Sequence, residues 1–283
     1  MLENYRLEFA KTFRRPRTYL GFVAVGAISI LFTIAFHYMD VSTFLEHNGV
    51  SAFFTMVGSA VNALFVAMMV LSGPTMELFI PAIVVLVAGD LLAGEAAEGT
   101  LKMVLVRPVK RARIYFAKFA LAGTYTVLIM VALGLASFLL GALVFGIGDL
   151  MVPGPFLLIN QWINLFPVEE GIMRLIGAYA LAAWAMLTMA ALAFAISGGI
   201  DNANGAIITP LVLMLLLKIM ALFPTFDGIR PYLFTSHFDL WKSLFMAEVP
   251  WKEVWRSAEY LGLHTFLFLA AGLAVFNRRD ILS

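Results

Sequence analysis

The sequence of 283 residues contains no cysteine and few charged side chains. Without cysteine, the chain can form no disulfide framework, no cysteine-bound zinc site and no thiol nucleophile. Only 13% of the residues are charged and 62% are hydrophobic, whereas an ordinary soluble domain is about 25% charged. A water-soluble fold of this length cannot bury so much apolar surface. This composition therefore excludes a soluble globular protein, a disordered chain and a nucleic-acid-binding protein.

The sequence also lacks two further patterns, the histidine spacing of a metal site and the phosphate-binding loop of an ATPase. The four histidines lie singly, with no HxxxH or HExxH spacing, so we predict no metal site on this chain. The sequence also lacks the GxxxxGK[ST] phosphate-binding loop, so we expect no ATP hydrolysis, no cofactor and no catalytic residue here.

Long uncharged runs predict an all-α integral membrane protein that forms one domain over residues 1–283. A helix needs about 20 apolar residues to cross the bilayer. The runs that meet this length predict six transmembrane helices at 19–39, 70–93, 117–147, 173–198, 204–223 and 258–276. We expect Pro74 and Pro81 to kink the second span. Residues 52–69, which precede that span, are expected to form a tilted helix or one that lies on the outer surface.

The distribution of basic residues predicts the orientation. Lysine and arginine concentrate in three segments, 6–17, 102–118 and 278–279, which hold 13 of the 19 basic residues. The positive-inside rule places all three in the cytoplasm. Both termini are therefore expected on the cytoplasmic side, with membrane lipid around the spans; the family resemblance described below implies that this membrane is a prokaryotic inner membrane.

Segments outside the spans have patterns of their own. Residues 2–14 predict an amphipathic helix in the membrane interface, because Leu2, Tyr5, Phe9 and Phe13 recur on one face. On the outer side, 149–171 predicts an interfacial hairpin. Two short amphipathic helices are expected within 224–257, one over 236–247 and one from Trp251 onward, with tryptophans at the headgroup level.

The stretch after the second span is the most informative. A Gly-flanked acidic turn precedes a short helix expected over 100–106, which Thr100 caps through its hydroxyl and which ends before Pro108. The apolar side of this helix carries Leu101, Val104 and Leu105. This pattern fits a docking element for a cytoplasmic partner, and it also fits an ordinary charged loop.

The pattern G-E-x-x-E-G-T-L-x-x-x-L-x-x-P-V-x-R-x-x-I-x-x-x-K in this stretch resembles the type-2 (ABC-2) permease family of ATP-binding-cassette transporters. In this chain it consists of Gly94, Glu95, Glu98, Gly99, Thr100, Leu101, Leu105, Pro108, Val109, Arg111, Ile114 and Lys118. The six-span plan and the ending Phe276-Asn277-Arg278-Arg279-Asp280-Ile281 resemble the same family.

The resemblance implies the membrane subunit of an exporter, which a separate ATPase subunit drives with its own ATP and Mg²⁺. Residues 1–18 would form an elbow helix, 94–113 a coupling segment with a cytoplasmic coupling helix, and 224–257 extracytoplasmic helices before the sixth span. A second permease chain, identical or different, would complete the translocation path.

The resemblance also implies roles for the residues of the coupling segment. Glu95 and Glu98 would orient the turn, and Gly99 would permit it. The ATPase would contact Thr100, Leu101, Val104 and Leu105. The basic residues Arg107, Arg111 and Lys118 would hold the segment at the anionic lipid face.

Two charged residues, Glu77 and Lys218, fall inside predicted spans. Such charges are costly and face a partner or water. One hypothesis is that they pair and line the pathway, and the other is that Lys218 snorkels to the interface.

Other classes of membrane protein stay open as alternatives. A secondary transporter or a membrane scaffold or immunity protein would work without an ATPase partner. The E-E-x-x-x-R pattern at Glu169, Glu170 and Arg174 matches intramembrane CAAX-type proteases. The two histidine motifs of that family are absent from the sequence, so we give this alternative the least weight.

Overall fold

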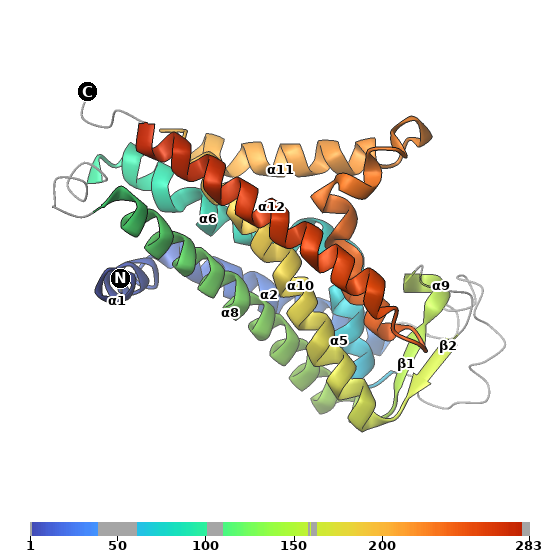
Figure 1. Ribbon diagram of the computed structural model, residues 1–283. Coiled ribbons are helices and arrows are strands. Elements are labelled where there is room, and N and C mark those ends of the chain that lie inside the picture. The colour runs from blue at the N-terminus through green and yellow to red at the C-terminus, as the bar shows by residue number, and fades with distance from the viewer. Residues whose placement is uncertain (1, 39–60, 101–109, 158, 160–162, 279–283) are drawn as a thin grey trace.

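The computed structural model describes residues 2–38, 61–100, 110–157, 159 and 163–278. Its elements, in chain order, are α1 (Leu2–Thr12), α2 (Pro16–Tyr38), α5 (Ala63–Leu71), η1 (Thr75–Phe79), α6 (Ile80–Ala97), α8 (Arg111–Phe145), β1 (Leu150–Pro153), α9 (Gly154–Leu157), β2 (Ile163–Phe166), α10 (Val168–Ser197), α11 (Ala203–Met220), η2 (Pro224–Phe226), η3 (Arg230–Tyr232), η4 (Phe234–Phe245) and α12 (Trp251–Arg278). Figure 1 shows them as a bundle of long helices.

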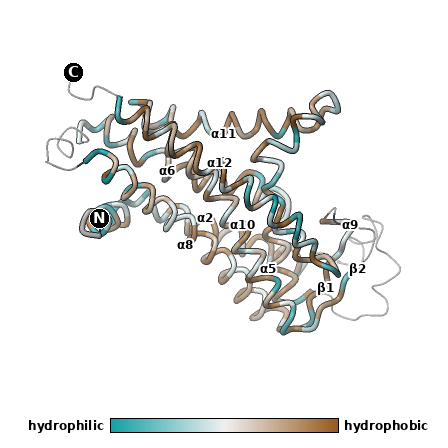
Figure 2. The backbone as a smooth tube through the Cα atoms, in the orientation of Figure 1, coloured by the Kyte–Doolittle hydropathy of each residue, from teal (hydrophilic) through white to brown (hydrophobic). Residues whose placement is uncertain are grey.

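Within the described residues, six helical segments are long and apolar enough to cross a membrane. They are α2, the continuous pair η1 and α6 over Thr75–Ala97, α8, α10, α11 and α12. Each overlaps one predicted span, which confirms the prediction of an all-α integral membrane protein. Many large apolar side chains of these helices are exposed, because their solvent is lipid. Figure 2 colours much of the length of these helices as hydrophobic.

The bundle has two distinct ends. The first, which we name the α1 end, holds α1, the last turns of α6, the first turns of α8 and the last turns of α12 (Figure 1). The second, the hairpin end, holds β1, β2 and the first turns of α10. The helices α6 and α10 lie at the centre, since more of their surface is buried than that of α11 and α12.

A sharp break in the chain comes directly before the second span. The short helix α5 precedes it, and all nine residues of α5 are buried where it packs against α2, α8 and α10. Helical geometry ends at Ser72, and Gly73 follows with a φ of +56°, a conformation that favours glycine. The π-helical turn η1 begins after Pro74.

The structure corrects one of the two placements expected for the helix before the second span, and one of the two expected proline kinks. The helix before the second span does not lie on the surface, because its uniformly apolar side chains are buried among three neighbours. Residues 52–60 of that prediction fall outside the described residues. The break occurs at Gly73 and Pro74, whereas Pro81 lies in the first turn of α6, a position that proline favours.

The hairpin end confirms the predicted hairpin and corrects the helices beyond it. Strands β1 and β2 pair antiparallel, with Leu150 opposite Phe166. The first expected amphipathic helix is present as the 3-10 helix η4. The second is not separate, because the helix that begins at Trp251 continues to Arg278. Its 28 residues span roughly 42 Å, more than the ~30 Å hydrocarbon layer.

One arginine ties this end together. Arg174 of α10 lies over the ring of Phe166, 3.9 Å from its centroid, and donates to the main-chain oxygens of Leu244 and Met246 at the end of η4. It also pairs with Glu170 one turn earlier, at 2.7 Å. One guanidinium therefore contacts the hairpin, α10 and η4 together, and it satisfies main-chain oxygens left free at the end of η4.

Candidate functional site

The α1 end contains a group of opposite charges drawn from three segments of the chain. We name it the charge cluster, and its members are Glu8, Lys11, Arg15, Arg17, Asp90, Glu95, Glu98 and Lys118. Along the sequence, Glu98 precedes residues 101–109 and Lys118 follows them; residues 101–109 themselves lie outside the described structure.

Lys118 is at the centre of the charge cluster. Its side chain has no exposed surface, and its Nζ lies 2.7 Å from Oε1 of Glu95 and 2.8 Å from Oε2 of Glu8. Glu95, itself only 4% exposed, also receives Lys11 at 2.5 Å. The four charges balance, which is the condition under which buried ions are tolerated. Their contacts join α1, α6 and α8.

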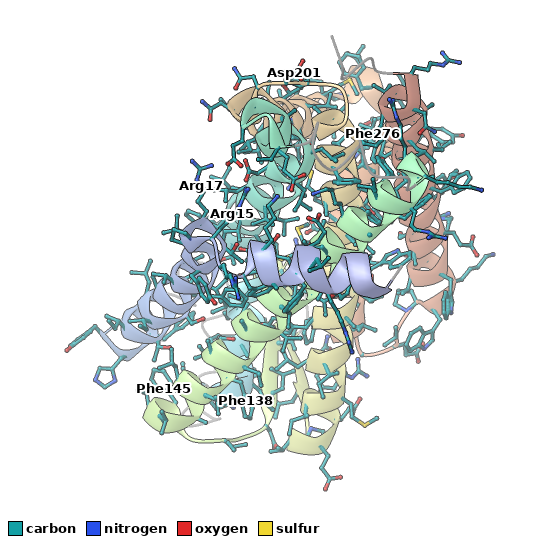
Figure 3. All side chains as sticks on the ribbon, turned by 90° about the vertical axis from the view of Figure 1, so that its left-hand side faces the viewer. Arg15, Arg17, Phe138, Phe145, Asp201 and Phe276 are labelled. Atoms are coloured by element: carbon teal, nitrogen blue, oxygen red, sulfur yellow. The ribbon has the colours of Figure 1, made fainter. Side chains whose placement is uncertain are left out.

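Arg15 makes the second link in the charge cluster. It lies in the short connection between α1 and α2, and its two terminal nitrogens lie 3.1 Å from Asp90 and 3.1 Å from Glu98. Arg17 approaches the other oxygen of Asp90 at 3.8 Å. Figure 3 shows Arg15 and Arg17 near each other. The planar guanidinium of Arg15 can thus fix the last two turns of α6 to the start of α2.

The turn after α6 depends on one glycine. Glu98 ends the helix, and Gly99 follows with a φ of +71°, the left-handed conformation common after a helix C-cap. Its main-chain N–H donates to the oxygen of Ala96. Thr100 donates its hydroxyl to the oxygen of Glu95 at 3.3 Å. The chain therefore leaves α6 in a fixed direction.

The amphipathic helix α1 packs against the bundle through its aromatic face. Phe9 and Phe13 stack with ring centroids 4.3 Å apart, and the Tyr5 hydroxyl lies 2.9 Å from the Thr124 hydroxyl of α8. In Figure 3, α1 runs across α8. The helix thus lies crosswise to the spans and attaches through both its aromatic face and the charge cluster.

The structure corrects the role expected for Lys118 and gives a second basic residue a contact within the protein. Lys118 does not reach the lipid face, because two carboxylates hold it fully buried. The other residue, Arg111, donates to the main-chain oxygens of Phe276 and Asn277, the latter at 3.1 Å. It therefore contacts the C-terminal end of α12, where main-chain oxygens lack helical partners.

The remaining predicted site residues divide into two sets. Leu101, Val104, Leu105, Arg107 and Pro108 lie outside the described residues. Glu77 and Lys218 are both described, but no ion pair joins them in the described structure. Instead the Lys218 ammonium lies 5.9 Å from the ring centroid of Phe238 in η4. The prediction that the two line a pathway stays untested.

Sequence reasoning missed five members of the charge cluster, namely Glu8, Lys11, Arg15, Arg17 and Asp90. A signal for them existed. Asp90 follows a long apolar run, and a buried acid needs a basic partner. Basic partners for it were available in the N-terminal segment, but the positive-inside rule had assigned those residues to orientation alone.

Residues 5–168 match the family described as ABC-2 family transporter protein. This range runs from α1 to the first residue of α10 and includes the whole charge cluster and the turn at Gly99. No curated protein matches the chain.

Proposed function

Because this chain belongs to the ABC-2 family of transporter proteins, we propose that it is a permease subunit that couples ATP hydrolysis on a separate ATPase subunit to substrate export. ATP and Mg²⁺ would bind that partner. A second permease chain would face this one across the translocation path.

The charge cluster is the observation that carries the proposal. It ties α1, α6 and α8 together on both sides of the coupling segment 94–113, with the turn direction fixed at Gly99. A push on a segment held this way would move three helices together. A segment attached to one helix by a flexible turn would not transmit the movement to the other helices. The attachment of three helices through the charge cluster therefore supports a role in coupling.

The proposed orientation places the α1 end in the cytoplasm of a prokaryotic cell. Basic residues of α1 and α8, and Arg278 at the end of α12, gather at this end, which agrees with the positive-inside rule. The hairpin end with η4 would then lie outside, where it would cap or guide the exit.

Co-purification tests the proposal. The chain is tagged at its C-terminus, extracted in mild detergent, and its companions are identified, with an ATPase assay on the eluate. We expect a stoichiometric ATPase subunit whose hydrolysis vanadate inhibits. The variant Leu101→Asp should insert and elute normally but lose that subunit or its activity, because a charge would enter an apolar contact. Leu101→Met is the matched control and should retain both.

Two results would overturn the proposal. One is a well-folded chain that purifies without any ATPase. The other is a Leu101→Asp variant with the same bound subunit and the same hydrolysis as the parent protein.

A further inference from the structure

The helix η4 is a 3-10 helix of unusual length. It runs over the 12 residues Phe234–Phe245, whereas 3-10 runs longer than about three or four residues are uncommon, because their hydrogen-bond geometry is poorer than that of an α-helix. Contacts with other elements must therefore help to hold this form, and η4 packs against α10, α11 and α12.

The sequence of η4 has the pattern of an α-helix. Its aromatic side chains occupy positions i, i+4, i+7 and i+11, which form one face at 3.6 residues per turn; they are Phe234, Phe238, Trp241 and Phe245. Its polar side chains would form the opposite face of the same α-helix, and they are Thr235, Ser236, Asp239, Lys242 and Ser243. In a 3-10 helix, side chains three apart eclipse, so the aromatic residues are divided among all three rows. The local pattern and the observed backbone therefore disagree.

Thr235 shows what the 3-10 form leaves unsatisfied. It shares a row of η4 with Phe238 and Trp241, and all three side chains are buried. In the described structure, the Thr235 hydroxyl and the Trp241 indole N–H are buried without a hydrogen-bond partner, which is unfavourable. In an α-helix, Thr235 would instead join Asp239 and Lys242 at i, i+4 and i+7 on the polar face, where water can satisfy the hydroxyl.

The first turn of η4 is attached to α12. The ring of Phe234 packs edge-on against the ring of Phe268 of α12, with ring centroids 5.5 Å apart. Nδ1 of His237 lies 3.0 Å from the Ser257 hydroxyl of the same helix. This end of η4 therefore moves with α12.

The last turn of η4 is attached to α10 and the hairpin. Arg174 of α10 donates to the main-chain oxygen of Leu244, and Asn164 of β2 donates to the main-chain oxygen of Phe245 at 3.0 Å. The two ends of η4 are thus held by different parts of the bundle.

Conversion to an α-helix would shorten η4 between these two attachments. Its 12 residues span roughly 24 Å at 2.0 Å per residue in the 3-10 form and roughly 18 Å at 1.5 Å per residue in the α form. A shortening of about 6 Å would move the part of α12 that contacts η4 relative to α10.

We propose that η4 alternates between this 3-10 form and an α-helix during transport, and that the change moves α12 against α10. The two forms would belong to different nucleotide states of the ATPase subunit. This inference rests on the proposed export function and adds the moving element to it.

Pairs of spin labels distinguish the two forms. Residues four apart are neighbours on an α-helix but point about 120° apart on a 3-10 helix, whereas residues three apart are close in both. The informative pair is therefore Asp239→Cys with Ser243→Cys, and Ser236→Cys with Asp239→Cys is the matched positive control. The chain itself has no cysteine, and the complex of the unsubstituted chain gives the background from the ATPase subunit.

The labelled chain is purified with the ATPase subunit that accompanies it and placed in nanodiscs. Spectra are recorded without nucleotide and with ATP trapped by vanadate. We expect the 236/239 pair to show dipolar broadening in both states and the 239/243 pair to show it in one state only. If the 239/243 pair gives the same spectrum in both states of a complex that hydrolyses ATP, the inference is overturned.

A Thr235→Val variant separates a role in the conformational change from a purely structural one. Valine lacks the hydroxyl that the 3-10 form leaves unsatisfied, so we expect the balance to shift about fivefold or more toward that form and ATP hydrolysis by the complex to slow. Thr126→Val removes a buried hydroxyl that is hydrogen-bonded within α8 and should change neither. A Thr235→Val variant with a raised unfolding temperature but the spectra and hydrolysis rate of the parent would contradict the inference.

The two proposals fail in different ways. Absence of an ATPase subunit overturns the export function and the inference that rests on it. An active ATPase subunit together with an unchanged 239/243 pair overturns the inference alone.

Discussion

Lys118 of α8 has no exposed side-chain surface, and its Nζ lies 2.7 Å from Oε1 of Glu95 on α6. The same nitrogen lies 2.8 Å from Glu8 of α1, so one ammonium holds three helices. A buried ion pair gains little over apolar packing, but removing one partner strands the other charge. The charge cluster is therefore more sensitive to single substitutions than to balanced ones.

We expect Lys118→Met to destabilise the protein by about 3–5 kcal/mol, the cost of breaking a buried pair. Adding Glu8→Gln should recover part of the loss, because Lys11 and Glu95 then form a balanced pair. Thermal unfolding in detergent measures both variants, and the double-mutant cycle isolates the coupling between the two residues.

The control for this prediction is Arg113→Met, five residues earlier on the same helix. Arg113 is exposed, and such substitutions change stability by about 0.5 kcal/mol or less. If Lys118→Met behaves like Arg113→Met, the charge cluster does not hold the α1 end together.

Gly272→Ala should destabilise the α1 end of the bundle. A Cβ at this position would clash with the Tyr115 hydroxyl and would lie 2.7 Å from Cα of Ala195, so α12 must move away from α10. Overpacking of this kind costs about 1–3 kcal/mol, more than the ~1 kcal/mol gained when alanine replaces a helical glycine.

Gly26→Ala provides the matched comparison. Gly26 is also inside a long helix, but a Cβ there would meet no atom within 4 Å. This variant should unfold at the same temperature as the parent or slightly higher. An equal effect of the two alanines on unfolding would show that α10 and α12 do not cross closely at Gly272.

Acid should loosen the contact between η4 and α12. The ring of His237 stacks on Tyr260, and its nitrogens lie 3.0 Å from the Ser257 hydroxyl and 2.9 Å from the main-chain oxygen of Pro231. Burial lowers the pKa of His237 below its ordinary value of 6.5, and the nearby His264 and Arg256 lower it further.

The direction of the pH effect follows from this shift. The unfolded chain holds its proton at higher pH than the folded one, so stability falls as pH drops through about 6.5 toward the folded pKa. Unfolding temperatures between pH 7.5 and 5 measure it. His237→Asn should reduce the loss, and His37→Gln controls for removal of an exposed imidazole. An unchanged loss in His237→Asn would contradict the prediction.

The spans could be predicted because each depends on one local quantity, the length of an uncharged run. The run after Arg17 contains the whole of α2 beyond its first two residues, and the fourth and sixth runs likewise overlap α10 and α12. The hairpin over 149–171 could also be predicted, since its prolines exclude a continuous helix. Its strand register depends on pairing across the turn, which the pattern of residues does not contain.

The site was harder to predict from the sequence, because its residues contact partners that are distant in sequence. Lys118 belongs to a basic run, and nothing local distinguishes it from Arg113, yet one is buried and the other exposed. The difference arises from the side of α8 on which α1 lies. Likewise, α5 was apolar enough to lie in a membrane interface or in a core, and only its three packing partners decide between them.

The bond between Lys118 and Glu8 joins residues 110 positions apart, and this separation sets an order for biosynthesis. At about 5–20 residues per second, α1 leaves the ribosome roughly 5–20 s before the lysine that anchors it. During that interval its acidic and basic side chains must remain hydrated at the bilayer surface while two membrane crossings are inserted. A ribosome stalled before α8 would therefore leave the N-terminal helix accessible to protease, and the same helix would become protected once the third crossing is complete.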